Sequence, residues 1–369
     1  MDLPTPIAWL VDEACASAGP ELFLAELGAL LLAEGVPLAG GALTLAVPHP
    51  IIARRTWLWR AESGAVIEAL SFGSIDPLGQ AGGVEQGKVG RDWLAGLGTG
   101  LVQEDVVGPA ADRRASGGPL LAWAISRPLG DRESTLLRQA ARFAAAPLAG
   151  LSWRATLAAL LEAYIGRRGA AHVLAGRSRR EIGETIRAVL LFADLRGFTE
   201  LSESIAPEAV VAALDAWFDR IAGAVHAFGG EVLKFIGDGV LAIFPIGERP
   251  TSVVCDAALR AVGAAQAGMA HLDEARRRQG LPPLHFGLAL HLGDMLWGNV
   301  GTADRLDFTA IGPAVNLVSR LEGLCRPLGR TVLVTGTVAA EATTALVPLG
   351  EHLLRGIAAP CAVFTLPEE

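Results

Sequence analysis

A continuous apolar run over residues 188–193, followed directly by Asp194, constrains the fold more than any other feature of the sequence. A strand with one face in water alternates apolar and polar residues, so an unbroken run predicts a central strand covered on both faces. Pro207 then opens a predicted helix, which Gly229 and Gly230 end. The apolar face of this helix consists of Val210, Leu214, Trp217, Phe218, Ile221 and Val225. The chain therefore predicts a buried strand with a carboxylate at its C-terminal end.

Two strand-like runs, 232–237 and 240–244, follow this helix. Asp238 and Gly239 join them, and because this dipeptide is typical of a tight hairpin, a second carboxylate is expected at the hairpin tip. A helix at about 251–279, a hairpin at about 285–300, a helix at about 313–325 and terminal strands complete a βαββαβ-like order. Residues 185–369 therefore predict an α+β domain with a palm-like, ferredoxin-related sheet.

The first part of the chain, residues 1–150, predicts a smaller α/β domain. Residues 22–32 have helical spacing, and 42–47, 55–60 and 120–126 are short apolar runs typical of strands. Glycines and prolines over residues 73–90 indicate loops. This order of elements resembles the small GAF or PAS type of sensor domain, which implies a regulatory function. Residues 151–184 have a mostly helical pattern and predict a connector.

Composition limits the partners and the location of the protein. A length of 369 residues suggests two domains, and the net charge of −8 argues against binding to nucleic acid or to an anionic membrane. The most apolar early stretch, 22–47, is interrupted by charged residues, prolines and glycines, so we expect no membrane span. The first basic residue is Arg54, which argues against a signal peptide. Four widely separated cysteines predict reduced thiols, and together these features predict a cytoplasmic protein.

Three motifs in the second half of the chain carry the chemistry. They are FADLRGFT at residues 192–199, LKFIGD at 233–238 and DFTAIGPAVNLVSR at 307–320. Their order and content resemble the catalytic domain of class III adenylate and guanylate cyclases, over roughly residues 185–367. This resemblance implies that the protein is an adenylate cyclase, which converts ATP to 3′,5′-cyclic AMP and pyrophosphate by two-metal-ion catalysis.

The first two motifs contain the predicted metal ligands. Two carboxylates, one at a strand end and one at a neighbouring hairpin tip, can converge on a pair of hard cations. The resemblance implies two Mg²⁺ or Mn²⁺ ions per site, held by Asp194, Asp238 and the carbonyl of Leu195. Unpaired backbone N–H groups where the next helix begins would bind triphosphate, and they belong to Gly197, Phe198 and Thr199. The resemblance also assigns Arg355 to the distal phosphates.

The third motif supplies the residues expected to act on the ribose and the α-phosphate. Asn316 and Arg320 lie four residues apart on a predicted helix, so they project from one face. The resemblance assigns Asn316 to the ribose and Arg320 to the charge that develops on the α-phosphate. A planar guanidinium that stays charged suits this oxyanion.

Base selection is expected to rest on Lys234 and Thr309. Most adenylyl cyclases of the family pair this lysine with an aspartate seven residues before the asparagine, where this chain has Thr309. A Lys and Thr pair resembles the branch that includes bicarbonate-responsive soluble cyclases. The threonine hydroxyl can accept a hydrogen bond from adenine N6 while Lys234 donates to N1, so ATP is the expected substrate.

The resemblance also implies an assembly. Family members form their site between two catalytic domains arranged head to tail, and this chain has one such domain with both sets of residues, which predicts a homodimer. Bicarbonate or another small molecule is an expected regulator. Two alternatives stay open, a diguanylate cyclase, whose GGDEF signature residues 229–233 match only in part, and an inactive cyclase domain that binds nucleotide without turnover.

Overall fold

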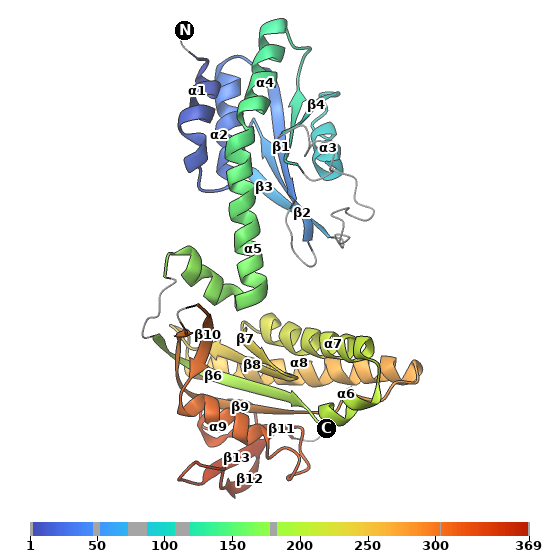
Figure 1. Cartoon of the computed structure of the whole chain (residues 1–369), viewed down its shortest axis with the longest axis vertical. Coiled ribbons are helices and arrows are strands. Elements are labelled where there is room, and N and C mark those ends of the chain that lie inside the picture. Colours follow the sequence, from blue (N-terminus) through green and yellow to red (C-terminus); the bar gives the residue numbers. More distant parts are fainter. Residues whose placement is uncertain are drawn as a thin grey trace. The chain divides into compact units, whose positions relative to one another are not determined.

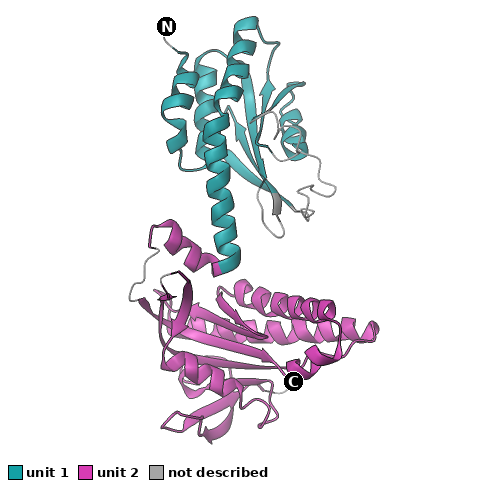
Figure 2. Ribbon diagram, viewed as in Figure 1, with its two compact units in different colours: residues 1–164 teal, residues 165–369 magenta. Residues whose placement is uncertain are grey.

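The computed structural model describes residues 3–46, 52–72, 87–107, 118–177, 183–302 and 304–367. These residues form two compact units, one over residues 1–164 and one over 165–369 (Figure 2). The boundary lies inside the segment that the sequence predicts as a connector. Each unit has its own hydrophobic core.

The first unit is built on a five-stranded antiparallel sheet with strand order β3-β2-β1-β5-β4 (Figure 1). Helices α1, α2 and α4 supply apolar side chains to the larger core on one face, and α3 packs on the other face. The strands are β1 (Leu38–Ala46), β2 (Ile52–Arg60), β3 (Val66–Phe72), β4 (Leu101–Val106) and β5 (Leu120–Ile125). The helices are α1 (Thr5–Asp12), η1 (Ala14–Ala16), α2 (Pro20–Ala33), α3 (Lys88–Ala95) and α4 (Asp131–Phe143).

The elements predicted for the first unit are confirmed, and the structure adds β3 and β4 to them. The two additional strands form the opposite edges of the sheet, β3 at one edge and β4 at the other. Most of the loop predicted over residues 73–90 lies outside the described residues, and its last residues begin α3.

Helix α5 (Ala145–Leu174) crosses the boundary between the two units and breaks at Gly166. At Gly166 φ is 75° and ψ is 164°, a backbone conformation that side-chain-bearing residues rarely adopt. Among the described residues, no single helix is long and apolar enough to cross a membrane. Helices α4 and α5 reach that length and hydropathy only when taken together, and the chain bends by 42° between them.

The second unit contains an eight-stranded sheet with the order β12-β13-β11-β9-β6-β8-β7, in which β10 pairs with β9. Its strands are β6 (Glu184–Leu195), β7 (Glu231–Ile236), β8 (Gly239–Pro245), β9 (Phe286–Gly301), β10 (Leu306–Ile311), β11 (Val332–Thr335), β12 (Val347–His352) and β13 (Cys361–Thr365). Its helices are α6 (Phe198–Ser204), α7 (Pro207–Ala227), α8 (Thr251–Arg278), α9 (Pro313–Glu322) and α10 (Gly336–Ala339).

Strand β6 is central and covered on both faces, as the unbroken apolar run predicts. Val189, Leu191 and Ala193 belong to the core that α7 and α8 cover. Ala188 and Leu190 point the other way, into the core that α9 covers. The α+β fold predicted for this unit is confirmed, and its central strand ends at the predicted metal ligand.

Two predicted hairpins differ from the structure. Residues 286–301 form one long strand, β9, because residues 286–297 all pair with β6, and the hairpin partner of β9 is β10. The turn between β7 and β8 consists of Gly237 and Asp238, one residue earlier than predicted, since Ile236 pairs with Gly239. Gly237 has a φ of 63°, which suits a glycine at the first central position of a two-residue turn.

Candidate functional site

The two predicted metal ligands lie side by side at one end of the central strands. Asp194 is the penultimate residue of β6, and Asp238 lies in the turn between β7 and β8. A Cβ atom added at Gly239 would be 3.3 Å from the Asp194 carboxylate, so the turn passes close to the end of β6. The absence of a side chain at Gly239 therefore leaves room for Asp194 beside the turn.

The environment of Asp194 disfavours a negative charge on it. Burial raises the pKa of Asp194 to about 7, and the charge of Asp238, the charge of Glu322 and a hydrogen bond with Asp238 add to the effect. The Leu195 N–H donates a hydrogen bond to the Asp194 carboxylate, which lowers its pKa and offsets only part of this increase. Without a cation, the protein holds these neighbouring carboxylates at a cost in electrostatic energy.

This geometry fits a divalent cation. A cation between Asp194 and Asp238 would replace their mutual repulsion with attraction. Among the described residues, no group of three or more His, Cys, Asp and Glu side chains has an arrangement that could hold a metal ion. Mg²⁺ is usually bound through only one or two carboxylates, with substrate phosphates and water as further ligands, so two aspartates and the Leu195 carbonyl suit it.

Two residues near the aspartates were not predicted from the sequence. The indole Nε1 of Trp217, a fully buried residue of α7, donates a 2.8 Å hydrogen bond to the carbonyl of Asp238. Burial raises the pKa of Glu322, the charge of Arg196 lowers it, and the charge of Asp238 raises it further. The position of Glu322, two residues after Arg320, carried no signal for a role beside the metal ligands.

The predicted triphosphate site follows Asp194 directly. Gly197 has a φ of 71° and precedes helix α6, which begins at Phe198. Thr199 lies in the first turn of this helix and is exposed. These backbone N–H groups therefore lie within a few residues of Asp194 in the sequence, and triphosphate binding there stays a prediction.

The lysine predicted to read the base has an unpredicted partner. Lys234 on β7 forms an ion pair with Asp307 on β10. Thr309 lies two residues further along β10, so Asp307 and Thr309 share one face of that strand. Asp307 opens the third motif, and its place in that motif was the signal that could have identified it.

The remaining predicted residues lie on α9 and the loop before β13. Asn316 and Arg320 are both exposed on α9. The guanidinium of Arg320 donates a hydrogen bond to the backbone carbonyl of Arg355, which brings these two predicted phosphate ligands together. The contacts thus assemble three groups, the aspartates with α6, Lys234 with β10, and Arg320 with Arg355.

Known proteins match the second unit. Residues 183–362 match the family model of the adenylate and guanylate cyclase catalytic domain. An adenylate cyclase of Anabaena cylindrica is 35% identical over 164 residues, which are 43% of this chain and 32% of the relative. Adenylate cyclase 1 of Rhizobium meliloti is 36% identical over 154 residues, 41% of this chain and 23% of the relative.

The chain is also similar to solved structures. The structure of the adenylyl cyclase CyaB from P. aeruginosa is 26% identical in sequence and has a TM-score of 0.45. The alignment covers 50% of this chain and 96% of the other. The chain spans about a third or less of the length of the two curated relatives above. The family match covers 180 of the 369 residues, and these residues are similar to an adenylate and guanylate cyclase catalytic domain.

Replacing Asp194 with Asn should stabilise the metal-free protein at high pH. The folded state binds a proton on Asp194 up to a pKa of about 7, well above the ordinary value, so stability falls as pH rises from about 4 through 7. At pH 8 we expect Asp194→Asn to raise the unfolding free energy of the second unit by about 1–2 kcal/mol after allowance for solvent screening. Denaturant unfolding at pH 8 and pH 5, with a chelator present to remove metal ions, measures this unfolding free energy for both proteins.

The difference in unfolding free energy between Asp194→Asn and wild type should shrink at pH 5, where the wild-type Asp194 carboxyl is already protonated. Asp215→Asn, an exposed change on α7, is the matched control and should have little effect at either pH. Equal stability of Asp194→Asn and wild type at pH 8 would contradict the electrostatic account.

Proposed function

We propose that this protein is an adenylate cyclase that forms 3′,5′-cyclic AMP and pyrophosphate from ATP. The observation that carries the proposal is the pair of facing carboxylates, Asp194 and Asp238, at the end of the central strands of a cyclase catalytic domain. Two relatives named adenylate cyclase, 35% and 36% identical over 164 and 154 residues, support ATP as the substrate.

The proposed reaction is an in-line displacement within one nucleotide. The ribose 3′ oxygen bonds to the α-phosphorus, the bond from that phosphorus to the pyrophosphate oxygen breaks, and the hydroxyl proton leaves to solvent. Two divalent ions, held by Asp194, Asp238 and the Leu195 carbonyl, would lower the pKa of the attacking hydroxyl and neutralise the leaving group.

The protein's own residues would bind and orient the substrate. The N–H groups of residues 197–199 would bind the triphosphate, and Arg355 its distal end. Asn316 would orient the ribose, and Arg320 would stabilise the charge on the α-phosphate, since a guanidinium fork matches phosphate oxygens. For the base, Lys234 would donate to adenine N1 and Thr309 would accept from N6. The ion pair with Asp307 orients Lys234 before the base arrives.

Product analysis tests this function. Full-length protein incubated with Mn²⁺ and either ATP or GTP should release cyclic AMP from ATP, as identified by mass spectrometry. Asp238→Ala should lower the rate by about 100-fold or more, because it removes a metal ligand. Asp219→Ala, an exposed change on α7, should leave the rate near wild type.

The other outcomes are informative. Cyclic GMP as the main product would contradict the roles given to Lys234 and Thr309. Nucleotide binding with no product from either substrate would favour the inactive cyclase domain.

We also propose that two copies share each site. Asn316 and Arg320 are exposed, and the apolar residues Phe235 and Ile236 are about half exposed directly before the turn that carries Asp238. Exposed apolar side chains beside charged groups are typical of a surface that another chain covers. A homodimer with two-fold symmetry would bring the aspartates of one copy to the Asn and Arg of its partner.

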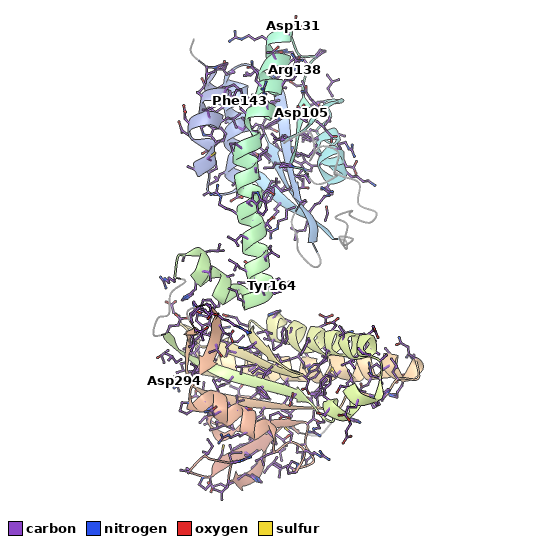
Figure 3. All side chains as sticks on the ribbon, in the orientation of Figure 1. Asp105, Asp131, Arg138, Phe143, Tyr164 and Asp294 are labelled. Carbon is purple, nitrogen blue, oxygen red and sulfur yellow. The ribbon has the colours of Figure 1, made fainter. Side chains whose placement is uncertain are left out.

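Helix α5 offers a second contact between copies. Before its break at Gly166, it exposes Trp153 (74%), Leu157 (50%), Leu160 (40%) and Tyr164 (85%). Their spacing of four, three and four residues places them along one stripe, the pattern that two supercoiled helices bury between them. Figure 3 labels Tyr164 at the lower end of the straight part of this helix.

Charges on this stripe should therefore weaken the dimer. The double change Leu157→Glu and Leu160→Glu buries repelling carboxylates, so the dimer dissociation constant should rise by roughly 100-fold or more. Light scattering after size exclusion measures the mass at micromolar concentration. Glu162→Lys, an exposed change outside the stripe, is the control. An unchanged dimer in the double variant would exclude this contact.

We propose that the first unit regulates the cyclase domain, a role supported by the helix that runs from one unit into the other. The likeness to GAF or PAS sensor domains, and activation by bicarbonate or another small molecule, stay predictions. A flat response to a bicarbonate titration at constant pH would remove the bicarbonate prediction.

A further inference from the structure

The end of helix α5 contacts the strands that carry the base-reading residues. Residues 167–174 follow the break at Gly166 and belong, like those strands, to the second unit. A side chain at Gly166 would be strained by its positive φ, so this glycine permits the change of direction. We call residues 167–174 the clamp helix.

Arg168 of the clamp helix holds the first residues of two strands. Its Nε and Nη2 donate to the two carboxylate oxygens of Glu231 at 3.0 and 2.9 Å, and its Nη1 donates to Glu184 at 2.8 Å. Glu231 begins β7 and Glu184 begins β6. Two parallel hydrogen bonds from one guanidinium fix orientation as well as distance. The Arg168 side chain is only 26% exposed, so solvent screens these bonds less than at an open surface.

An aromatic stack links the clamp helix to β10. The His172 ring meets Trp297 edge-on at 4.9 Å between ring centroids. Trp297, buried on β9, stacks on Phe308 of β10 at 4.9 Å with 16° between the ring planes. The Arg168 guanidinium lies 5.8 Å from the Trp297 ring, within range of a cation–π contact. A Cβ added at Gly169 would be 3.2 Å from Phe308, so the helix backbone approaches this ring closely.

The far ends of these contacts are the base-reading residues. Glu231 lies three residues before Lys234 on β7, and Phe308 lies between Asp307 and Thr309 on β10. The ion pair of Lys234 with Asp307 joins the two strands. The clamp helix, β7 and β10 therefore form a closed ring of contacts.

We propose that the clamp helix positions Lys234 and Thr309 and so sets the affinity and selectivity for the nucleotide base, with Arg168 as a positioning residue. This rests on the proposed function. None of the clamp contacts involves Asp194, Asp238 or Arg320. Loosening the clamp helix should weaken recognition of the base and leave the phosphate chemistry largely unchanged.

The test compares Arg168→Gln with wild type and two further variants. Arg168→Gln should raise the KM for ATP by roughly threefold to tenfold, with kcat changed less than twofold, and should lower the preference for ATP over GTP by a similar factor. Arg168→Lys keeps the positive charge but lacks the planar guanidinium that donates two parallel hydrogen bonds. Its KM and its preference for ATP should lie between those of wild type and Arg168→Gln. Arg167→Gln, an exposed neighbour, is the control and should match wild type.

A binding measurement separates this proposal from the catalytic one. Calorimetry with 3′-deoxy-ATP, which lacks the attacking hydroxyl, should show the same loss of affinity in Arg168→Gln. The change Glu231→Gln should produce a loss no larger than that of Arg168→Gln, which also removes the bond to Glu184. The double variant should lose no more than Arg168→Gln alone, because the Arg168–Glu231 interaction is already absent there.

The outcomes are distinguishable. If wild type makes cyclic AMP but Arg168→Gln keeps its KM and base preference, the clamp proposal is wrong while the function stands. If wild type makes no cyclic product and Arg168→Gln still weakens analogue binding, the function fails and the clamp stands. If wild type neither reacts nor binds the analogue, both fail. A fall in kcat at constant KM in Arg168→Gln would also overturn the positioning role.

Discussion

The proposed site of the second unit depends on the repulsion between two carboxylates that the fold holds together. Strand β6 is fixed by apolar packing on both faces, so Asp194 at its end cannot move away from the turn that carries Asp238. The turn is fixed in its own way, since the buried indole of Trp217 bonds to the Asp238 carbonyl. Hydrophobic packing therefore supplies the energy that keeps Asp194 at a pKa of about 7, and divalent cations would recover that energy on binding.

The residues predicted to read the base are held by different forces. Lys234 lies on an outer strand of the sheet, and Thr309 lies on a strand that pairs with β9 outside the main strand order. The residues of β7 and β10 are only partly buried or exposed, whereas most apolar residues of β6 are buried, so contacts of Arg168, His172 and Trp297 help to hold these two strands. This contrast separates the firmly held carboxylates from the proposed base site, which the end of α5 contacts through β7 and β10. It offers a physical route by which the helix between the two units could affect substrate choice.

The sequence predicted the parts of this fold that rest on local pattern. The central strand was predicted from its unbroken apolar run, and α7 from its proline, periodicity and glycines. The position of the β7–β8 turn was off by one residue, because Gly237 rather than Gly239 takes the positive φ, and composition does not distinguish them. Strand β9 was mistaken for a hairpin, since its length comes from pairing with β6. The roles of Glu322 and Arg168 depend on contacts between distant residues, which a single sequence does not reveal, whereas Asp307 could have been identified from its place at the start of the third motif.

The central claim is that each site takes its metal ligands from one copy and its Asn and Arg from another. Mixing Asp238→Ala with Arg320→Ala, each inactive alone, tests this most directly under conditions where dimers exchange subunits. A mixed dimer would contain one site with all its residues intact and one site with both defects. We predict that equal mixing restores about a quarter of the wild-type rate per total protein, because half of the dimers are mixed and each has one working site. No recovery, with exchange of subunits verified independently, would contradict the shared site.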